Sequence, residues 1–134
     1  MTTPEAGDDK TQMRVPSQSS NKIPARLQAS VAILEGHAEG MEYPITKTYA
    51  VIGRDKDSDV PVKDSLVSRQ HAAILYQEGS FILKDLDSTN GTHMKGSAIK
   101  QANLRHGDKF LVGDSVLQFI LEDTGSGKIY EIRE

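Results

Sequence analysis

Length and charge exclude several classes of protein. The chain has 134 residues, with 16 basic and 19 acidic side chains and a formal net charge of −3. Such a chain predicts one domain, and its acidic balance argues against general binding to nucleic acid or to an anionic membrane. It has no apolar run long enough to span a membrane, no signal-peptide pattern and no cysteine. We therefore expect a cytoplasmic protein without disulfide bonds or a thiolate metal site, and we expect no cofactor.

The N-terminal segment differs in composition from the rest of the chain. Residues 1–28 are rich in Thr, Ser, Gln, Pro and charges, and their apolar residues, including Ile23 and Leu27, follow no period. Such a segment buries too little apolar surface to offset the entropy of ordering the chain. We predict a disordered tail over 1–28, a folded domain over 29–123 and a C-terminal extension over 124–134.

From Ala29 onward, short apolar runs alternate with turn residues, which is typical of an all-β fold. Trp is absent and aromatic residues are few, so the core is predicted to be aliphatic. Turns of two residues are predicted at Gly113-Asp114, Glu78-Gly79 and Lys95-Gly96. No window has a helical stripe, so a sandwich or barrel of many short antiparallel strands is expected. The predicted strands are Ser30–Leu34, Met41–Ile45, Tyr49–Ile52, Ala72–Tyr76, Phe81–Leu86, His93–Met94, Ala98–Ile99, Lys109–Val112 and Val116–Leu121.

Three polar clusters interrupt these runs between Val51 and Thr92. They are Gly53-Arg54-Asp55, Ser68-Arg69-Gln70-His71 and Asp87-Ser88-Thr89-Asn90-Gly91-Thr92. Together they offer fixed cations, hydroxyl and amide groups, and glycines that let a ligand approach the backbone. If the strands lie side by side, the clusters meet at one edge. We predict that this edge binds a phosphate group.

Each cluster also has a purely structural interpretation. Arg54 could pair with Asp55 or Asp57 at the surface, and Ser68 could hydrogen-bond its own backbone in a turn. Asn90-Gly91 signals a turn whatever the function of the loop.

Ser68 and His71 also raise the question of catalysis. They lie three residues apart, but no acid is positioned to orient the histidine, and no phosphate-binding or dinucleotide motif is present. The four histidines have no spacing typical of metal ligands. We predict that the protein is not an enzyme, and that His71 is a hydrogen-bonded strut between two loops.

The order Gly53-Arg54, Ser68-x-x-His71 and Asn90-Gly91-Thr92 within an all-β domain resembles the forkhead-associated (FHA) domain, as found in small bacterial proteins. The resemblance covers roughly residues 30–122. It implies a sandwich of about eleven mostly antiparallel strands that binds phosphothreonine peptides with the loops at one end. The implied partners are a phosphothreonine protein and a Ser/Thr kinase; the alternative is a scaffold that binds proteins without phosphate.

The resemblance also implies a role for each matching residue. The phosphate contacts would be Arg54, Ser68, Arg69 and Thr89, and Asn90 would bind the peptide main chain. The residues that support the site would be Gly53, His71, Gly91 and Thr92. Leu66 falls where the family often selects the residue three after the phosphothreonine, and its apolar side chain does not support a preference for an acid.

The tail contains one candidate site of phosphorylation. Thr11 follows two acids in Asp8-Asp9-Lys10-Thr11 and resembles the phosphorylated tail threonines of some small bacterial FHA proteins. We predict about 18 residues between Thr11 and the first strand, enough chain for phosphorylated Thr11 to reach the domain's own site. Phosphorylation would then inhibit the binding of outside ligands.

Overall fold

In the computed structural model of this protein, residues 22–125 are described. Thr11, most of the predicted tail and the end of the predicted extension lie outside the described residues. Within residues 22–125 the chain forms eleven strands, as expected for the fold class. The strands are β2 (Leu27–Glu35), β3 (Glu42–Ile45), β4 (Tyr49–Gly53), β5 (Val60–Pro61), β6 (Ala72–Gln77), β7 (Ser80–Asp85), β8 (Thr92–Met94), β9 (Ser97–Ile99), β10 (Gln101–Leu104), β11 (Lys109–Val112) and β12 (Ser115–Asp123).

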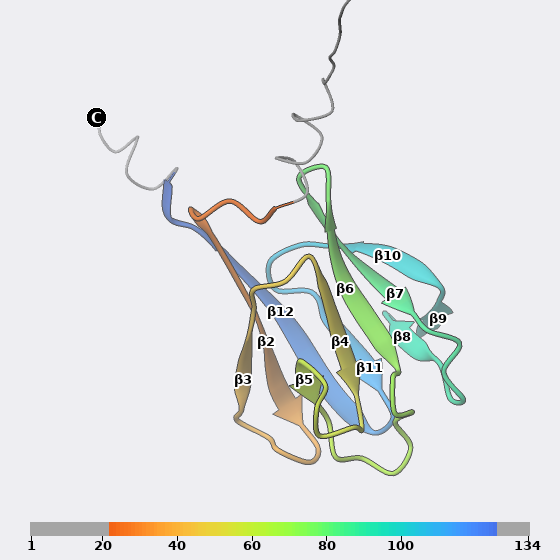
Figure 1. The fold of residues 1–134 in the computed structure, drawn as a ribbon. Coiled ribbons are helices and arrows are strands. Elements are labelled where there is room, and N and C mark those ends of the chain that lie inside the picture. Colours follow the sequence, from red (N-terminus) through yellow and green to blue (C-terminus); the bar gives the residue numbers. More distant parts are fainter. Residues whose placement is uncertain (1–21, 126–134) are drawn as a thin grey trace, which may run out of the picture.

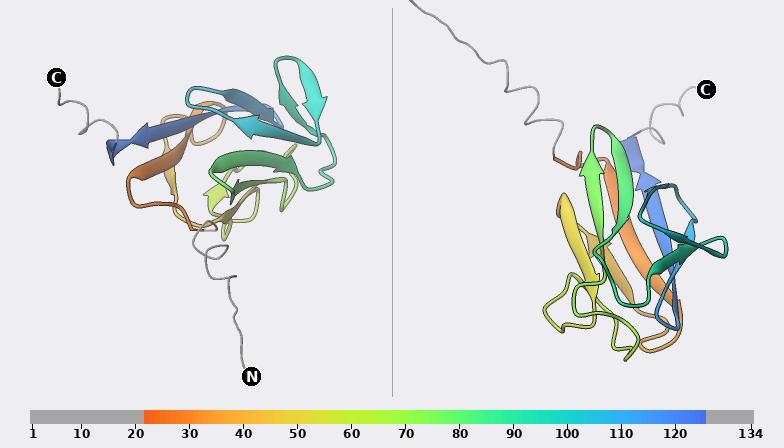
Figure 2. Two further views of the ribbon diagram at one scale, coloured as in Figure 1. Left: turned by 90° about the horizontal axis from the view of Figure 1, so that it is seen from above. Right: turned by 90° about the vertical axis from the view of Figure 1, so that its right-hand side faces the viewer.

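The strands form two sheets that pack face to face as a sandwich (Figures 1 and 2). One sheet has the order β10-β7-β6-β4-β5, and the other has the order β3-β2-β12-β11-β8-β9. Every pair is antiparallel except β4 with β5. The predicted all-β sandwich of mostly antiparallel strands is confirmed.

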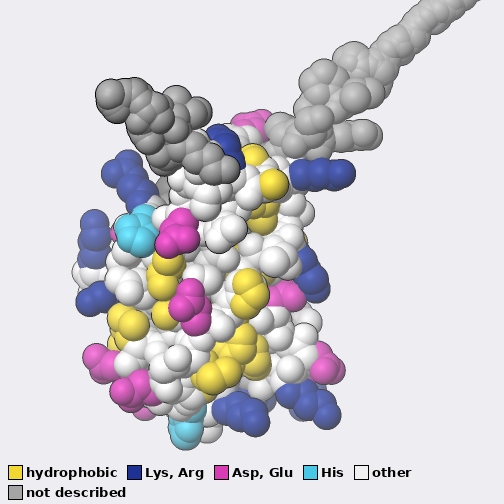
Figure 3. All heavy atoms as spheres, turned by 90° about the vertical axis from the view of Figure 1, so that its left-hand side faces the viewer, with side chains coloured by type: hydrophobic (Ala, Val, Ile, Leu, Met, Phe, Trp, Pro, Cys, Tyr) yellow, Lys and Arg dark blue, Asp and Glu magenta, His cyan; other side chains and the backbone are white. Residues whose placement is uncertain are grey.

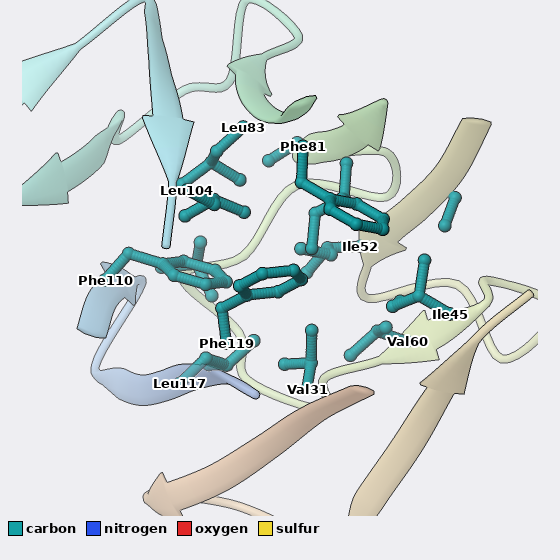
Figure 4. Packing of buried hydrophobic residues seen from close by; sticks show 14 of the residues in the cluster. Val31, Ile45, Ile52, Val60, Phe81, Leu83, Leu104, Phe110, Leu117 and Phe119 are labelled. Atoms are coloured by element: carbon teal, nitrogen blue, oxygen red, sulfur yellow. The ribbon is translucent and has the colours of Figure 1, made fainter. Parts of the chain in front are cut away.

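The core lies between the two sheets because alternate residues of each strand point inward. In β12, Leu117 and Phe119 are fully buried while Gln118 and Ile120 lie on the other face. Phe119 packs against Phe81 with ring centroids 5.2 Å apart (Figure 4). The buried residues are mainly aliphatic, as predicted, but all three phenylalanines of the chain are among them.

The three predicted two-residue turns are present. Gly113-Asp114 joins Val112 to its strand partner Ser115, and Gly113 has a φ of 59°. Both residues of Glu78-Gly79 and of Lys95-Gly96 have positive φ, which is the geometry that matches the twist of a hairpin. These turns set the register of their hairpins.

Two strands were not predicted. The strand β5 has only two residues, one of them proline, and it pairs in parallel with the end of β4 at the edge of the sheet. The strand β10 (Gln-Ala-Asn-Leu) has one buried side chain, Leu104, and its mainly polar composition gave no strand pattern in the sequence. The loop between β5 and β6, predicted as polar, is also anchored in the core by Val62 and Val67.

The first strand begins earlier than expected, inside the segment assigned to the tail. It starts at Leu27, and both Ile23 and Leu27 pack against the core. Arg26 forms an ion pair with Asp123, and the carbonyl of Arg26 accepts a hydrogen bond from the N–H of Thr124. Ile23 lies before the strand, where no strand period applies, whereas Leu27 continues the inward alternation of Ala29 and Val31, a signal that the sequence analysis missed.

The surface carries charges of both signs. Figure 3 shows acidic, basic and exposed hydrophobic side chains interspersed over one side of the molecule. Among residues 22–125, no helix is long and apolar enough to cross a membrane.

Candidate functional site

The register of the five-stranded sheet brings the three polar clusters together. Ala72, the first residue of β6, pairs with Ile52 near the end of β4 and with Asp85 at the end of β7. Because β6 is antiparallel to both neighbours, its start lies beside their ends. The loops 54–59, 62–71 and 86–91 therefore meet at one pole of the sandwich (Figure 1).

Gly53 allows the first two of these loops to pack backbone against backbone. A Cβ atom at Gly53 would lie 1.9 Å from the carbonyl oxygen of Arg69. The close approach lets the N–H of Arg54 donate to the carbonyl of Ser68 at 2.9 Å. Any side chain at position 53 would push these two loops apart.

His71 joins the second loop to the third. Its imidazole is fully buried, and its Nδ1 accepts the N–H of Ser68 at 3.0 Å. The proton must therefore sit on Nε2, which donates to the carbonyl of Gly91 at 2.8 Å. Both ring nitrogens are used, so the ring links the loops through their backbones.

Asp85 organises the third loop and was missed by the sequence analysis. Its carboxylate accepts hydrogen bonds from the hydroxyls of Ser88 (2.6 Å) and Thr92 (2.7 Å) and from the N–H of Ser88 (3.1 Å). The Ser88 hydroxyl in turn accepts the N–H of Gly91 at 2.9 Å. Burial raises the pKa of Asp85, but these hydrogen bonds outweigh it, so the pKa lies below its ordinary value. The spacing Asp85-x-x-Ser88, typical of an Asx-type turn, was the available signal.

Asp64 organises the second loop in a similar way, and the sequence analysis did not identify it either. It is a buried aspartate that accepts the N–H groups of Leu66 and Asp114 and the hydroxyl of Ser115. Burial raises its pKa, yet the hydrogen bonds outweigh burial and hold the pKa below its ordinary value. Asp64 therefore ties the 62–71 loop to the β11–β12 turn, a contact between residues about fifty apart in sequence that no local pattern reveals.

Two arginines at this pole have no acidic partner. Among residues 22–125, no acid forms an ion pair with Arg54 or Arg69, so the surface pairing considered for Arg54 is absent. The Asp55 carboxylate instead accepts the N–H of Asp57. One guanidinium nitrogen of Arg54 donates to the carbonyl of Val67 at 3.2 Å, which leaves its other donors exposed.

Ser68 and Asn90 are each fixed by a hydrogen bond and still have an O–H or N–H group left to donate. The Ser68 Oγ accepts the N–H of Thr89 at 3.0 Å, so its own O–H proton is left to donate to another group. The Asn90 Nδ2 donates to the carbonyl of Leu66 at 2.9 Å, which leaves the amide oxygen and one N–H free. All nine site residues named from the sequence, other than Thr11, lie in or directly beside the three converging loops.

The comparisons with known proteins agree with this geometry. The model of the FHA domain family matches residues 50–113, which include the three loops. This chain contains an FHA domain. The glycogen accumulation regulator GarA of Mycolicibacterium smegmatis is 30% identical over 102 residues, which cover 73% of this chain and 65% of GarA.

The fold of this chain is similar to those of solved FHA domains. An FHA domain studied for its phosphothreonine-dependent interactions has a TM-score of 0.64 at 28% identity, covering 69% of this chain and 95% of that one. EmbR of Mycobacterium tuberculosis in complex with a low-affinity phosphopeptide has a TM-score of 0.65 at 27% identity, covering 81% of this chain and 28% of EmbR. By sequence, EmbR is 34% identical over 93 residues, so this chain spans about a quarter of that relative's length (24%).

Replacing His71 tests the strut. His71→Ala should lower the free energy of unfolding by about 1–3 kcal/mol, because it leaves a buried N–H and a buried carbonyl without partners. Urea unfolding would measure this, with the exposed His37→Ala as the control, for which a change within about 0.5 kcal/mol is expected. A His71→Ala protein of wild-type stability that failed to bind ligand would instead make His71 a ligand contact.

The loss of unfolding free energy at acid pH should depend on Asp85. Its folded-state pKa lies below the ordinary value of 3.8, so it stabilises the fold above that pH, and the contribution is lost as pH falls through the folded pKa. Between about pH 4 and pH 2, the unfolding free energy of Asp85→Asn should therefore fall less steeply than that of the wild type. Urea titrations across this range would measure the slope, with the exposed Asp57→Asn as the control. Equal slopes for Asp85→Asn and wild type would contradict the assignment.

Proposed function

We propose that this protein binds phosphothreonine peptides at the pole where the three loops meet. The observation that carries the proposal is that the converging loops hold Arg54 and Arg69, which form no ion pair among residues 22–125, at the pole where the O–H of Ser68 is left to donate. A phosphate dianion supplies the charge and the acceptors that these donors lack. The similarity to an FHA domain studied for its phosphothreonine-dependent interactions, and to EmbR in complex with a phosphopeptide, supports the proposal.

Each site residue then has a distinct task. Arg54, Arg69, Ser68 and Thr89 contact the phosphate, while Asn90 uses its free amide oxygen and N–H on the peptide main chain. The support consists of Gly53, His71, Gly91 and Thr92, together with Asp64 and Asp85. Leu66, at 42% exposure, offers an apolar contact to a residue further along the peptide.

The loops favour binding over catalysis. A catalytic serine needs a base that accepts its proton, but His71 receives the backbone N–H of Ser68 on Nδ1 and donates from Nε2. Neither nitrogen is free to act on the Ser68 hydroxyl. We therefore propose a binding module of Ser/Thr kinase signalling in the cytoplasm that is not an enzyme. A scaffold that ignores phosphate is the alternative.

Arg54→Ala tests the site. It removes a charge-assisted hydrogen bond to the phosphate and should weaken binding by about 30- to 1,000-fold. Calorimetric titration with a phosphothreonine peptide and its unphosphorylated twin would measure this. The control is Lys56→Ala, which removes an exposed cation from the same loop. Equal binding of both peptides would support the scaffold, and wild-type affinity of a normally folded Arg54→Ala would reject the site.

We also propose that phosphorylated Thr11 occupies this site. The described chain begins at the opposite pole, because Leu27 pairs with Asp123 at the far end of β12 (Figure 1). Ten residues lie between Thr11 and Lys22, and the eleven steps from one to the other span at most about 36–40 Å, while β12 alone is about 30 Å long. The reach within one molecule is thus shorter than the sequence suggested, and capture in cis requires a nearly extended tail.

Amide NMR of the phosphorylated chain would test this capture. We expect shifts at Arg54, Ser68 and Asn90 that are absent in Thr11→Ala. Shifts that persist on dilution indicate capture within one molecule, and shifts that fade indicate exchange of tails between molecules. The absence of shifts at these loops would reject the switch.

A further inference from the structure

A cavity of about 430 Å³ adjoins the proposed phosphate site. It lies between the 86–91 loop and the end of β9, and its walls include Thr89 and Asn90 from the loop and Ile99 and Lys100 from the β9 side. Its volume falls in the range of ligand pockets, about 300–1,000 Å³. Because Thr89 and Asn90 line this cavity and are also proposed ligand contacts, a peptide anchored at Thr89 would pass its mouth.

The cavity has an excess of negative charge. Asp85 and Asp87 both line it, against the single cation of Lys100. The Asp85 carboxylate is already engaged by Ser88 and Thr92, but its charge remains. Within residues 22–125, neither Asp87 nor Lys100 forms an ion pair, so the Asp87 carboxylate is free to bind a ligand group.

A bound phosphate would repel the negative charge of this cavity. Asp87 is two residues from Thr89, so their Cα atoms are at most about 7 Å apart, and charges at the two positions are separated by a distance on the scale of the screening length of about 8–10 Å at ordinary salt. A phosphate dianion at Thr89 therefore raises the cost of leaving Asp87 without a cation. A basic side chain on the same ligand would remove that cost, and its methylene stem would pack on Ile99 and Ala98.

We propose that this cavity binds an arginine or lysine side chain of the phosphothreonine ligand, with Asp87 as the residue that selects it. The inference rests on the proposed function and narrows the ligands to phosphothreonine peptides with a basic residue nearby. Given the span from Thr89 to Asp87, that residue lies within about three positions of the phosphothreonine. The positive charge of Lys100 repels a basic side chain in the cavity and so limits the preference for arginine or lysine.

A position scan with the full-length chain tests the proposal. The probes are alanine-based phosphothreonine peptides in which a single arginine occupies each position from three before to three after the phosphothreonine. Arginine at one or two positions on one side should tighten binding by about 2- to 5-fold over the all-alanine peptide. The same positions occupied by glutamate should weaken it.

Three variants decide whether Asp87 is responsible. Asp87→Asn should abolish the gain from arginine, and asparagine tolerates the φ of 56° at this position, so the fold should be kept. Lys100→Met should enlarge the gain, since it removes the opposing cation. Asp57→Asn, an equal loss of charge outside the cavity, should leave the gain unchanged.

The outcomes separate this inference from the proposed function. Phosphate-dependent binding with no preference for arginine, with an equal gain at every position, or with a gain that survives Asp87→Asn would overturn the cavity assignment alone. A preference for glutamate that is lost in Lys100→Met would assign the cavity to acidic side chains instead. Failure of every phosphopeptide to bind would overturn both proposals.

Discussion

The buried imidazole of His71 is the contact on which the pole of the three loops depends. Among residues 22–125, it is the single side chain that bonds both the backbone of the 62–71 loop and that of the 86–91 loop, through Ser68 and Gly91. In a buried site each of these hydrogen bonds is costly to leave unmade, so the ring fixes the separation of the loops. The hydroxyl of Ser68 and the N–H of Thr89 can meet because that separation is set.

Charge is distributed in two layers at this pole. Below the surface, the carboxylates of Asp64 and Asp85 are surrounded by N–H and O–H donors and hold the loops in shape. At the surface, Arg54 and Arg69 form no ion pair with an acid of the described residues. Because the loops are already fixed by internal bonds, an anion does not have to order them, and more of the binding energy remains for affinity.

The two poles of the sandwich have different tasks. One carries the three loops, and the other fastens the two ends of the described chain through Arg26, Asp123 and Thr124. A tail that leaves from the second pole must cover the length of the sandwich to reach the first. In the proposed capture of phosphorylated Thr11, strand length as well as tail length would therefore limit binding within one molecule.

The sequence by itself determined the fold class, most of the strands and the residues of the three loops. These features depend on residues that are close together in the chain, so the sequence alone reveals them. Examples are the alternation at Leu117 and Phe119, the turn Gly113-Asp114 and the motif Ser68-x-x-His71. The tertiary structure decided the rest. The buried role of Asp64, the absence of an acid beside Arg54, the two-residue strand β5 and the packing of Ile23 all depend on partners distant in sequence. Such contacts form only when two sheets close over one core, so no window of the sequence contains them.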